Sequence, residues 1–193
     1  MEQACVSREV LSATDKEELK RVAVDLAEAA RAASLPLFRS TNLALENKAD
    51  QGFDPVTHAD KAAERAMRAI LEAQRPEDGI LGEEYGETFG SSGLTWVLDP
   101  IDGTRSFMSG TPTWGVLIAL RDAAGPFFGV IDQPYIGERF IGGLGLNTMA
   151  GPLGAAALQT RSTRALKDAL LFSTFPEIGS RAEHASFQAV AKQ

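Results

Sequence analysis

The sequence predicts an α+β fold in which two helices cover one face of an antiparallel sheet. Apolar residues recur at helical spacing over residues 14–35 and again over residues 57–75. Short apolar segments separated by glycine-containing turns follow over residues 79–158, as expected for successive strands. From Ser162 the pattern becomes mixed again, which indicates the start of a second α/β layer.

The first helix is expected to begin at Thr14, because Thr14-Asp15-Lys16-Glu17 has the pattern of a capping box. It should end at Pro36, since proline is not tolerated inside a helix. One apolar face runs along it, formed by Leu19, Val22, Ala23, Leu26, Ala30 and Ala33.

A second helix should open at Thr57, after a polar, glycine-containing stretch over residues 47–55 that predicts a mobile loop or hairpin. This helix should end before Pro76. Its inward face is expected to comprise Ala62, Ala66, Ile70 and Leu71.

The strands are expected to be short and to follow one another along the chain. We place them at residues 79–83, 95–98, 113–120, 127–131, 139–142, 148–150 and 154–158. A turn over residues 122–125 should join the third and fourth of these strands. Beyond Ser162 we expect a helix over residues 166–170, a strand over 171–173 and another helix over 180–192.

The composition describes a globular chain without a broad basic surface. Its 193 residues are 44% hydrophobic, which is enough for a core of its own, and the formal net charge is −7. An acidic balance argues against nucleic acid or an anionic membrane as the main partner. Phosphate would therefore have to be bound locally.

The sequence also lacks the usual features of secreted or membrane proteins. The single cysteine, Cys5, cannot form an internal disulfide, and no Cys/His cluster has zinc-ligand spacing. The first residues are charged and have no apolar segment like that of a signal peptide. Glycines interrupt the apolar C-terminal half, so we expect a cytoplasmic protein without a membrane span.

Two aspartates, Asp99 and Asp102, lie three residues apart in a turn after an apolar strand. Pro100 restricts the backbone between them, so both carboxylates can converge. Carboxylate and carbonyl oxygens are the ligands that Mg²⁺ prefers, and the N–H groups of Gly103 and Thr104 can face an anion. The same aspartates could equally satisfy their own backbone as Asx turns.

Other polar residues could join this turn in one site. Asp60 lies in the first turn of the second helix, where the macrodipole favours an acid in any protein. Glu83 and Glu84 lie between glycines, and a cation would relieve their repulsion, although paired acids are also common in exposed turns. Arg105 could bind phosphate bidentately or form a surface salt bridge. The neighbouring aromatic residues are expected in the core instead: Trp96, Phe107 and Trp114.

Three motifs together resemble the inositol monophosphatase-like family, whose members are Mg²⁺-dependent, Li⁺-sensitive phosphomonoesterases. They are Thr57-His58-Ala59-Asp60 with Ala63-Glu64, Gly82-Glu83-Glu84-Tyr85-Gly86, and Trp96-Val97-Leu98-Asp99-Pro100-Ile101-Asp102-Gly103-Thr104. Arg105 and the segments 109–115 and 129–139 are similar to the histidinol-phosphatase branch. The resemblance covers about residues 15–190.

This resemblance implies two or three Mg²⁺ ions held by the acidic motifs. Glu83, Asp99 and the carbonyl of Ile101 would hold the first ion, and Asp99 and Asp102 would share the second. Asp60 and Glu83 would help to hold a third through water. In phosphoryl hydrolysis with two metals, one ion activates the water and the other stabilises the leaving oxygen.

The resemblance also implies the catalytic and phosphate-binding roles. Thr104, hydrogen-bonded towards Asp60, would orient the water that attacks phosphorus. The N–H groups of Gly103 and Thr104 would hold the phosphate oxygens, and Arg105 would contact the substrate.

The fold implied by the family is a layered α/β/α/β/α sandwich that forms a homodimer and acts on a small phosphomonoester. Because the family continues to an aspartate that completes the second metal site, we expect a C-terminally truncated chain with an incomplete second sheet layer. The expected parts are a tail over residues 1–13, an α+β metal-binding domain over 14–160 and the beginning of a C-terminal α/β domain over 161–193.

Three functions are compatible with these expectations. Arg105 and residues 109–115 favour a histidinol-phosphatase, which hydrolyses L-histidinol phosphate to L-histidinol and phosphate in histidine biosynthesis. An alternative substrate is inositol-1-phosphate or a related sugar phosphate. The third possibility is a truncated chain that binds a metal or a partner without catalysis.

Overall fold

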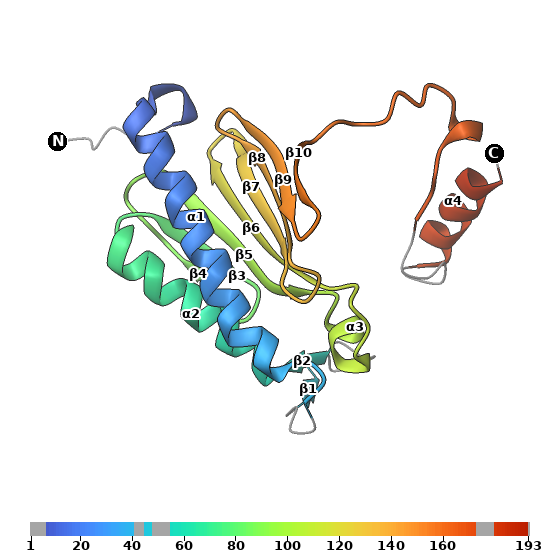
Figure 1. Cartoon of the computed structure of the whole chain (residues 1–193), viewed down its shortest axis with the longest axis horizontal. Coiled ribbons are helices and arrows are strands. Elements are labelled where there is room, and N and C mark those ends of the chain that lie inside the picture. Colours follow the sequence, from blue (N-terminus) through green and yellow to red (C-terminus); the bar gives the residue numbers. More distant parts are fainter. Residues whose placement is uncertain (1–6, 41–44, 48–54, 173–179, 193) are drawn as a thin grey trace. The chain divides into compact units, whose positions relative to one another are not determined.

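The computed structural model of the 193-residue chain describes residues 7–40, 45–47, 55–172 and 180–192. The chain divides into two compact units, residues 1–158 and residues 159–193. The first unit holds an eight-stranded sheet and two long helices, and Figure 1 shows both helices on the same side of that sheet. The expected α+β class is therefore confirmed.

Helix α1 (Ala13–Ser34) begins slightly earlier than predicted, because a different capping box starts it. Ser12 is the N-cap. Its hydroxyl accepts a hydrogen bond from the Asp15 N–H (3.2 Å), and its own N–H donates to the Asp15 carboxylate (2.9 Å). Thr14 thus lies inside the first turn, and Leu11 packs into the core just before the cap. The predicted apolar face is confirmed, with buried residues at Leu19, Val22, Ala23, Leu26 and Ala30.

Helix α2 (His58–Gln74) begins after Thr57 and ends before Pro76, as predicted. Its buried face is rotated from the expected one, since Ala62, Ala66 and Ile70 are only half-buried. A stripe that includes Met67 buries more apolar surface than one built on two alanines. The buried residues are Ala59, Asp60, Ala63, Glu64, Met67 and Leu71.

A two-stranded hairpin precedes α2. Strand β1 (Leu45–Asn47) pairs antiparallel with β2 (Pro55–Thr57), in agreement with the predicted loop or hairpin over residues 47–55. Residues 48–54 of that prediction lie outside the described residues.

The large sheet contains every strand that the sequence predicted in the first unit, and one short edge strand that it did not. That additional strand, β4, is only three residues long and fully exposed. The order across the sheet is β10 (Gly154–Ala157), β9 (Leu146–Gly151), β8 (Glu138–Gly143), β7 (Gly125–Gln133), β6 (Gly115–Asp122), β5 (Thr95–Asp102), β3 (Gly79–Gly82) and β4 (Gly86–Thr88).

The prediction of a wholly antiparallel sheet is wrong, because β3 and β5 run parallel. They pair from Gly79 with Thr95 to Gly82 with Leu98. The chain leaves β3 into the antiparallel edge strand β4 and then returns on the other side of β3. Apolar alternation marks a strand but not its direction, so the sequence pattern did not reveal this pair.

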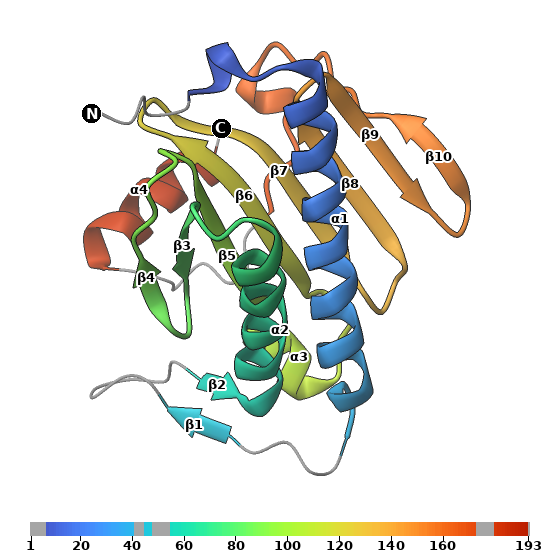
Figure 2. The same ribbon diagram turned by 90° about the vertical axis from the view of Figure 1, so that its left-hand side faces the viewer.

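The core lies between the sheet and the two helices. Helix α1 lies over β6 and β7, and α2 lies over β5 (Figure 2). Side chains that alternate along the strands face these helices, and Trp96 is fully buried among them. A smaller cluster packs beside the end of β5 and contains Phe38, Ala59, Ile101, Phe107 and Trp114. The predicted burial of the three aromatic residues is confirmed.

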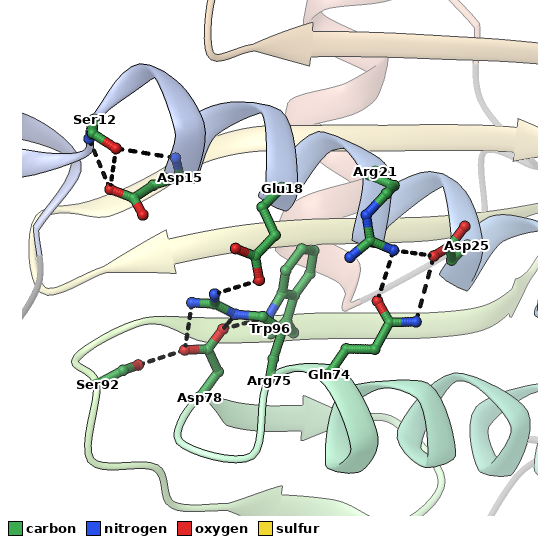
Figure 3. Close-up of polar contacts among 10 residues, drawn as sticks. All are labelled: Ser12, Asp15, Glu18, Arg21, Asp25, Gln74, Arg75, Asp78, Ser92 and Trp96. Carbon is green, nitrogen blue, oxygen red and sulfur yellow. Dashed lines mark hydrogen bonds and ion pairs between the residues drawn. The ribbon is translucent and has the colours of Figure 1, made fainter.

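A polar network ties the two helices to the start of β5 (Figure 3). The buried carboxylate of Asp78 accepts hydrogen bonds from Trp96 Nε1 (2.9 Å), Ser92 Oγ (2.6 Å) and Arg75 Nε (2.8 Å). Arg75 also reaches Glu18 on α1 (3.2 Å). All of these donors satisfy a carboxylate near the N-terminal end of β5. Asp99 and Asp102 lie in the C-terminal half of the same strand, where its register with β6 shifts between them, and not in a turn after a shorter strand as predicted.

Two residues of the predicted N-terminal tail, Arg8 and Leu11, pack against the rest of the first unit. A 3₁₀ helix (Arg8–Val10) presents Arg8 to Asp122 at the turn between β6 and β7. The Arg8 guanidinium donates to both carboxylate oxygens, at 2.9 and 2.6 Å, and the Arg8 N–H donates at 3.0 Å. This ion pair and the buried Leu11 hold the segment in place.

The opposite face of the central strands is open and apolar. A hollow of about 570 Å³ there is lined by Val97, Leu117, Ala119, Ile131 and Phe140 among others. Asp99 also lines it, so the open face of the sheet extends to the acidic end of β5.

The second unit contains a 3₁₀ helix (Leu166–Asp168) and helix α4 (Arg181–Ala191), so the two predicted helical segments are present, the first as a single turn. The strand expected over residues 171–173 does not form at Leu171 or Phe172, and Ser173 lies outside the described residues. An isolated apolar segment has no strand to pair with, and a lone strand leaves its backbone unpaired. Within the described part of the chain, no helix is long and apolar enough to span a bilayer.

Candidate active site

Parallel pairing of β3 and β5 brings Glu83 next to Asp99. Gly82 and Leu98 pair across the two strands, and the next residues are Glu83 and Asp99. The Glu83 N–H donates to the Leu98 carbonyl at 3.2 Å, which ties the end of β3 to β5. Ligand sites in sheets with parallel strands commonly lie beyond such carboxyl ends.

The acidic side chains at this edge repel one another. The pKa of Asp99 is raised to about 8, chiefly by burial, then by the charge of Glu83, a hydrogen bond with the Glu83 side chain and the charge of Asp102. A hydrogen bond from the Ile101 backbone acts in the opposite direction. A cation among these carboxylates would remove the repulsion between them.

One oxygen of Asp99 has no partner among the described residues. Oδ1 is buried and accepts no hydrogen bond, and unsatisfied buried oxygens are rare enough to need an explanation. The carbonyl of Ile101 lies two residues further along β5. Carboxylate and carbonyl oxygens are hard ligands that suit Mg²⁺, so the donor set fits the cation that the motif predicts.

The site is not preassembled as a complete metal centre. Across the residues that the structure describes, no group of three or more His, Cys, Asp or Glu side chains is already arranged to hold a metal ion. The acids approach as neighbours of Asp99, namely Glu83 and Asp102. The metal-ligand assignments for Glu83, Asp99, Ile101 and Asp102 therefore remain predictions, supported by proximity and by donor type.

Helix α2 brings Asp60 to Thr104. The Thr104 hydroxyl lies 3.4 Å from Asp60 Oδ1 and 3.2 Å from the Ile101 carbonyl, and can donate to either. Asp60 Oδ2 accepts from the Thr57 N–H (2.9 Å) and hydroxyl (2.5 Å). One oxygen of Asp60 therefore caps the helix, and the other faces Thr104, while a catalytic or metal-binding role for Asp60 stays a prediction.

Gly103 is required by the backbone of the turn. Its φ is +86°, and a Cβ atom there would lie 2.9 Å from the Thr113 carbonyl. It is the N-cap of α3 (Thr104–Ser109), and its carbonyl accepts the Phe107 N–H at 3.0 Å. Arg105 is exposed in the first turn of α3, and its contact with a substrate stays a prediction.

Sequence reasoning assigned no role to Glu64, although the structure places it beside the site. Its side chain is fully buried and accepts hydrogen bonds from the N–H groups of Glu84 (2.6 Å) and Tyr85 (3.2 Å). The available signal was its spacing from Asp60, since residues four apart share one face of a helix.

The sequence profile of the inositol monophosphatase family matches residues 15–192. The chain belongs to the inositol monophosphatase family. A solved structure of the inositol monophosphatase of Zymomonas mobilis agrees with this placement, with a TM-score of 0.74 and 39% identity over 94% of this chain and 67% of that one. The resemblance drawn from the three motifs is thereby confirmed.

Relatives within the inositol monophosphatase family carry different names. A histidinol-phosphatase of Streptomyces coelicolor is 42% identical over 124 residues, which cover 62% of this chain and 46% of that protein. An inositol-1-monophosphatase of Rhizobium meliloti is 36% identical over 141 residues, or 69% of this chain and 49% of that protein. The chain thus spans about half the length of these relatives.

Proposed function

We propose that this chain supplies the metal-binding part of a Mg²⁺-dependent phosphomonoester hydrolase that acts on L-histidinol phosphate. The observation that carries the proposal is the proximity of Glu83 and Asp102 to Asp99, whose buried Oδ1 has no hydrogen-bond partner among the described residues. Clustered carboxylates with a carbonyl are what a metal-assisted phosphatase requires, whereas a basic pocket is not. Membership of the inositol monophosphatase family supports the same reaction class.

In this proposal Glu83, Asp99 and Asp102 hold Mg²⁺ together with the Ile101 carbonyl. When bound, the metal would neutralise phosphate charge and lower the pKa of a coordinated water. Bringing in the cation requires the proton of Asp99 to leave, because metal ligands bind in their deprotonated form.

The other site residues position the nucleophile and the phosphate. Asp60 is held by Thr57 through one oxygen, so its other oxygen can accept the Thr104 hydroxyl proton in a hydrogen bond. Thr104 then has a lone pair free to accept a hydrogen bond from the attacking water and orient it. Gly103 allows the backbone to approach the phosphate closely, where a side chain would collide with Thr113.

Histidinol phosphate is the favoured substrate because several relatives similar to this chain, including the Streptomyces coelicolor and Mycobacterium tuberculosis proteins, are named histidinol-phosphatases. The Arg105 position and residues 109–115 support the same branch. The second candidate is inositol-1-phosphate, which is supported by the Rhizobium meliloti relative.

Phosphate release from both substrates, measured with Mg²⁺ and with a chelator, tests the proposal. We expect faster release from histidinol phosphate, loss of release with the chelator and no release by Asp99→Asn. Faster release from inositol-1-phosphate would overturn the substrate assignment. Mg²⁺ binding without phosphate release from either substrate would show that the chain alone is not catalytic.

A further inference from the structure

Glu64 is a buried carboxylate that holds a loop rather than a substrate. Helix α2 carries it to the loop that joins β3 to β4, where Oε2 accepts the Glu84 N–H at 2.6 Å and Oε1 accepts the Tyr85 N–H at 3.2 Å. Arg68, one turn further along α2, donates from Nε to Oε1 at 2.8 Å. The charge of a fully buried acid is thereby both paired and hydrogen-bonded.

Gly82 at the end of β3 leaves room for the Glu64 carboxylate. A Cβ atom on Gly82 would lie 1.8 Å from Glu64 Oε1 and 2.8 Å from an Arg68 guanidinium nitrogen. No side chain fits there, so only glycine lets the Glu64–Arg68 pair pass the end of β3. Arg68 also donates to the Gly86 carbonyl and to Thr88 Oγ1 (3.1 Å). The Glu64–Arg68 pair therefore binds both the loop and the strand β4 that follows it.

We infer that Glu64 is a positioning residue that fixes the Glu83 side chain beside Asp99 by anchoring the two residues that follow it. Glu83 precedes the anchored N–H groups of Glu84 and Tyr85 directly, and its own N–H is fixed to Leu98. The loop is thus held from both sides of Glu83. This inference rests on the proposed function, in which Glu83 is a metal ligand.

The same helix sets the distance between two parts of the site. Asp60 and Glu64 lie one turn apart on the buried face of α2, and they hold Thr104 and the Glu83 loop respectively. A rigid helix therefore keeps the loop in a constant position relative to Asp60. Groups that orient metal ligands in this way typically change metal affinity by about ten- to a hundred-fold when they are mutated.

The first test measures the anchoring itself. In Glu64→Gln, the amide keeps the volume of the side chain but presents its NH₂ group towards donors that need an acceptor. We expect faster amide hydrogen exchange at Glu84 and Tyr85 in the full chain, measured by NMR without metal. Asp78→Asn is the matched control, because it neutralises another buried, Arg-paired carboxylate outside this loop.

The second test measures the consequence for metal binding. Titration of the full chain with Mn²⁺, as a probe for the divalent site, should give an affinity about tenfold or more lower for Glu64→Gln. Asp78→Asn should bind Mn²⁺ like the wild type, even if its melting temperature is lower. Arg68→Lys keeps the positive charge but loses the forked guanidinium group. We expect it to speed up amide exchange and to lower Mn²⁺ affinity by smaller amounts than Glu64→Gln does. It replaces Glu64→Gln in both tests if that variant does not fold.

The outcomes separate this inference from the proposed function. Unchanged amide exchange in both loop variants, or faster exchange with unchanged Mn²⁺ affinity, would overturn the positioning role. Equal losses of affinity in Glu64→Gln and Asp78→Asn would reduce Glu64 to a stability residue and would overturn it as well. Normal Mn²⁺ binding by the wild type without phosphate release would contradict the proposed activity and leave the positioning role intact.

Discussion

Glu83 and Asp99 occupy equivalent positions on two parallel strands, each one residue beyond the Gly82–Leu98 pair. The sheet register therefore brings two carboxylates together at one edge, and Asp102 lies three residues further along β5. Such a grouping is unfavourable without a cation, because burial and like charge both oppose ionisation of Asp99. The fold without metal is more stable with Asp99 protonated, whereas metal binding requires Asp99 to be ionised.

Without divalent metal, the free energy of unfolding should fall as pH rises from about 4 to about 8. The native pKa of Asp99, about 8, lies above the ordinary value of about 3.9, so the folded chain retains a proton that the unfolded chain has lost. Asp99→Asn should remove this part of the pH dependence. Urea unfolding of both proteins in chelator, at about pH 5 and about pH 9, checks it, and an equal fall in both would contradict it.

Thr104→Val should lower the rate of phosphate release by a factor of about 10² to 10⁴, because it removes the hydroxyl that orients the water. Its free energy of unfolding should stay within about 1 kcal/mol of the wild type, since the valine is of similar size and the turn is only half-buried. Steady-state kinetics at saturating Mg²⁺ and chemical denaturation provide the two measurements.

Thr57→Ala is the matched variant for Thr104→Val, because it changes the other threonine that contacts Asp60. Loss of the N-cap should destabilise the chain by about 1 kcal/mol. A loss of stability for Thr104→Val that clearly exceeds the loss for Thr57→Ala would argue that Thr104 is structural.

Gly82→Ala should destabilise the chain by about 1–3 kcal/mol, because its methyl group would overlap the Glu64 carboxylate. Gly142→Ala is the control, since a Cβ atom on Gly142 meets nothing within 4 Å and that residue also lies in a strand. Thermal unfolding of both variants compares them, and equal melting temperatures would contradict the close approach at Gly82.

The ion pair at the N-terminus should make the fold sensitive to acid. Hydrogen bonds from Arg8 hold the pKa of Asp122 well below its usual range. The stabilisation is therefore complete above about pH 5 and is lost as pH falls below the ordinary aspartate value of about 3.9. Asp122→Asn should melt below the wild type at neutral pH, and the difference should shrink in acid. A difference that is independent of pH would contradict this ion-pair contribution.

The sequence predicted the elements better than their arrangement. Helix α2 and the strands from β5 to β9 follow from apolar spacing and turns, because such patterns reflect local burial. The parallel pairing of β3 with β5 depends on where the exposed three-residue strand β4 places the returning chain, and no local pattern encodes it. The start of α1 was misplaced because Ser12 and Thr14 both precede acids at capping distance.

At the site, the motifs indicated the residues that are candidates to bind metal or substrate. They did not indicate the residues that fix those candidates in position. Asp60, Asp99 and Thr104 belong to motifs whose chemistry is visible in one segment. Glu64 depends on a contact between a helix and a loop twenty residues away, and the sequence offers only indirect signs of it, its spacing from Asp60 and the glycine at position 82. Its burial cannot be read from helical spacing without the rotation of α2 that the structure shows.

All residues placed at the candidate site lie between Asp60 and Arg105, although the sheet around them extends to residue 157. Chains are made from the N-terminus, and early segments can fold while later ones are still being synthesised. Helix α2, β3, β5 and α3 therefore leave the ribosome before the outer strands exist. The acidic edge formed by β3 and β5 is thus synthesised before the outer strands of the sheet, β8, β9 and β10.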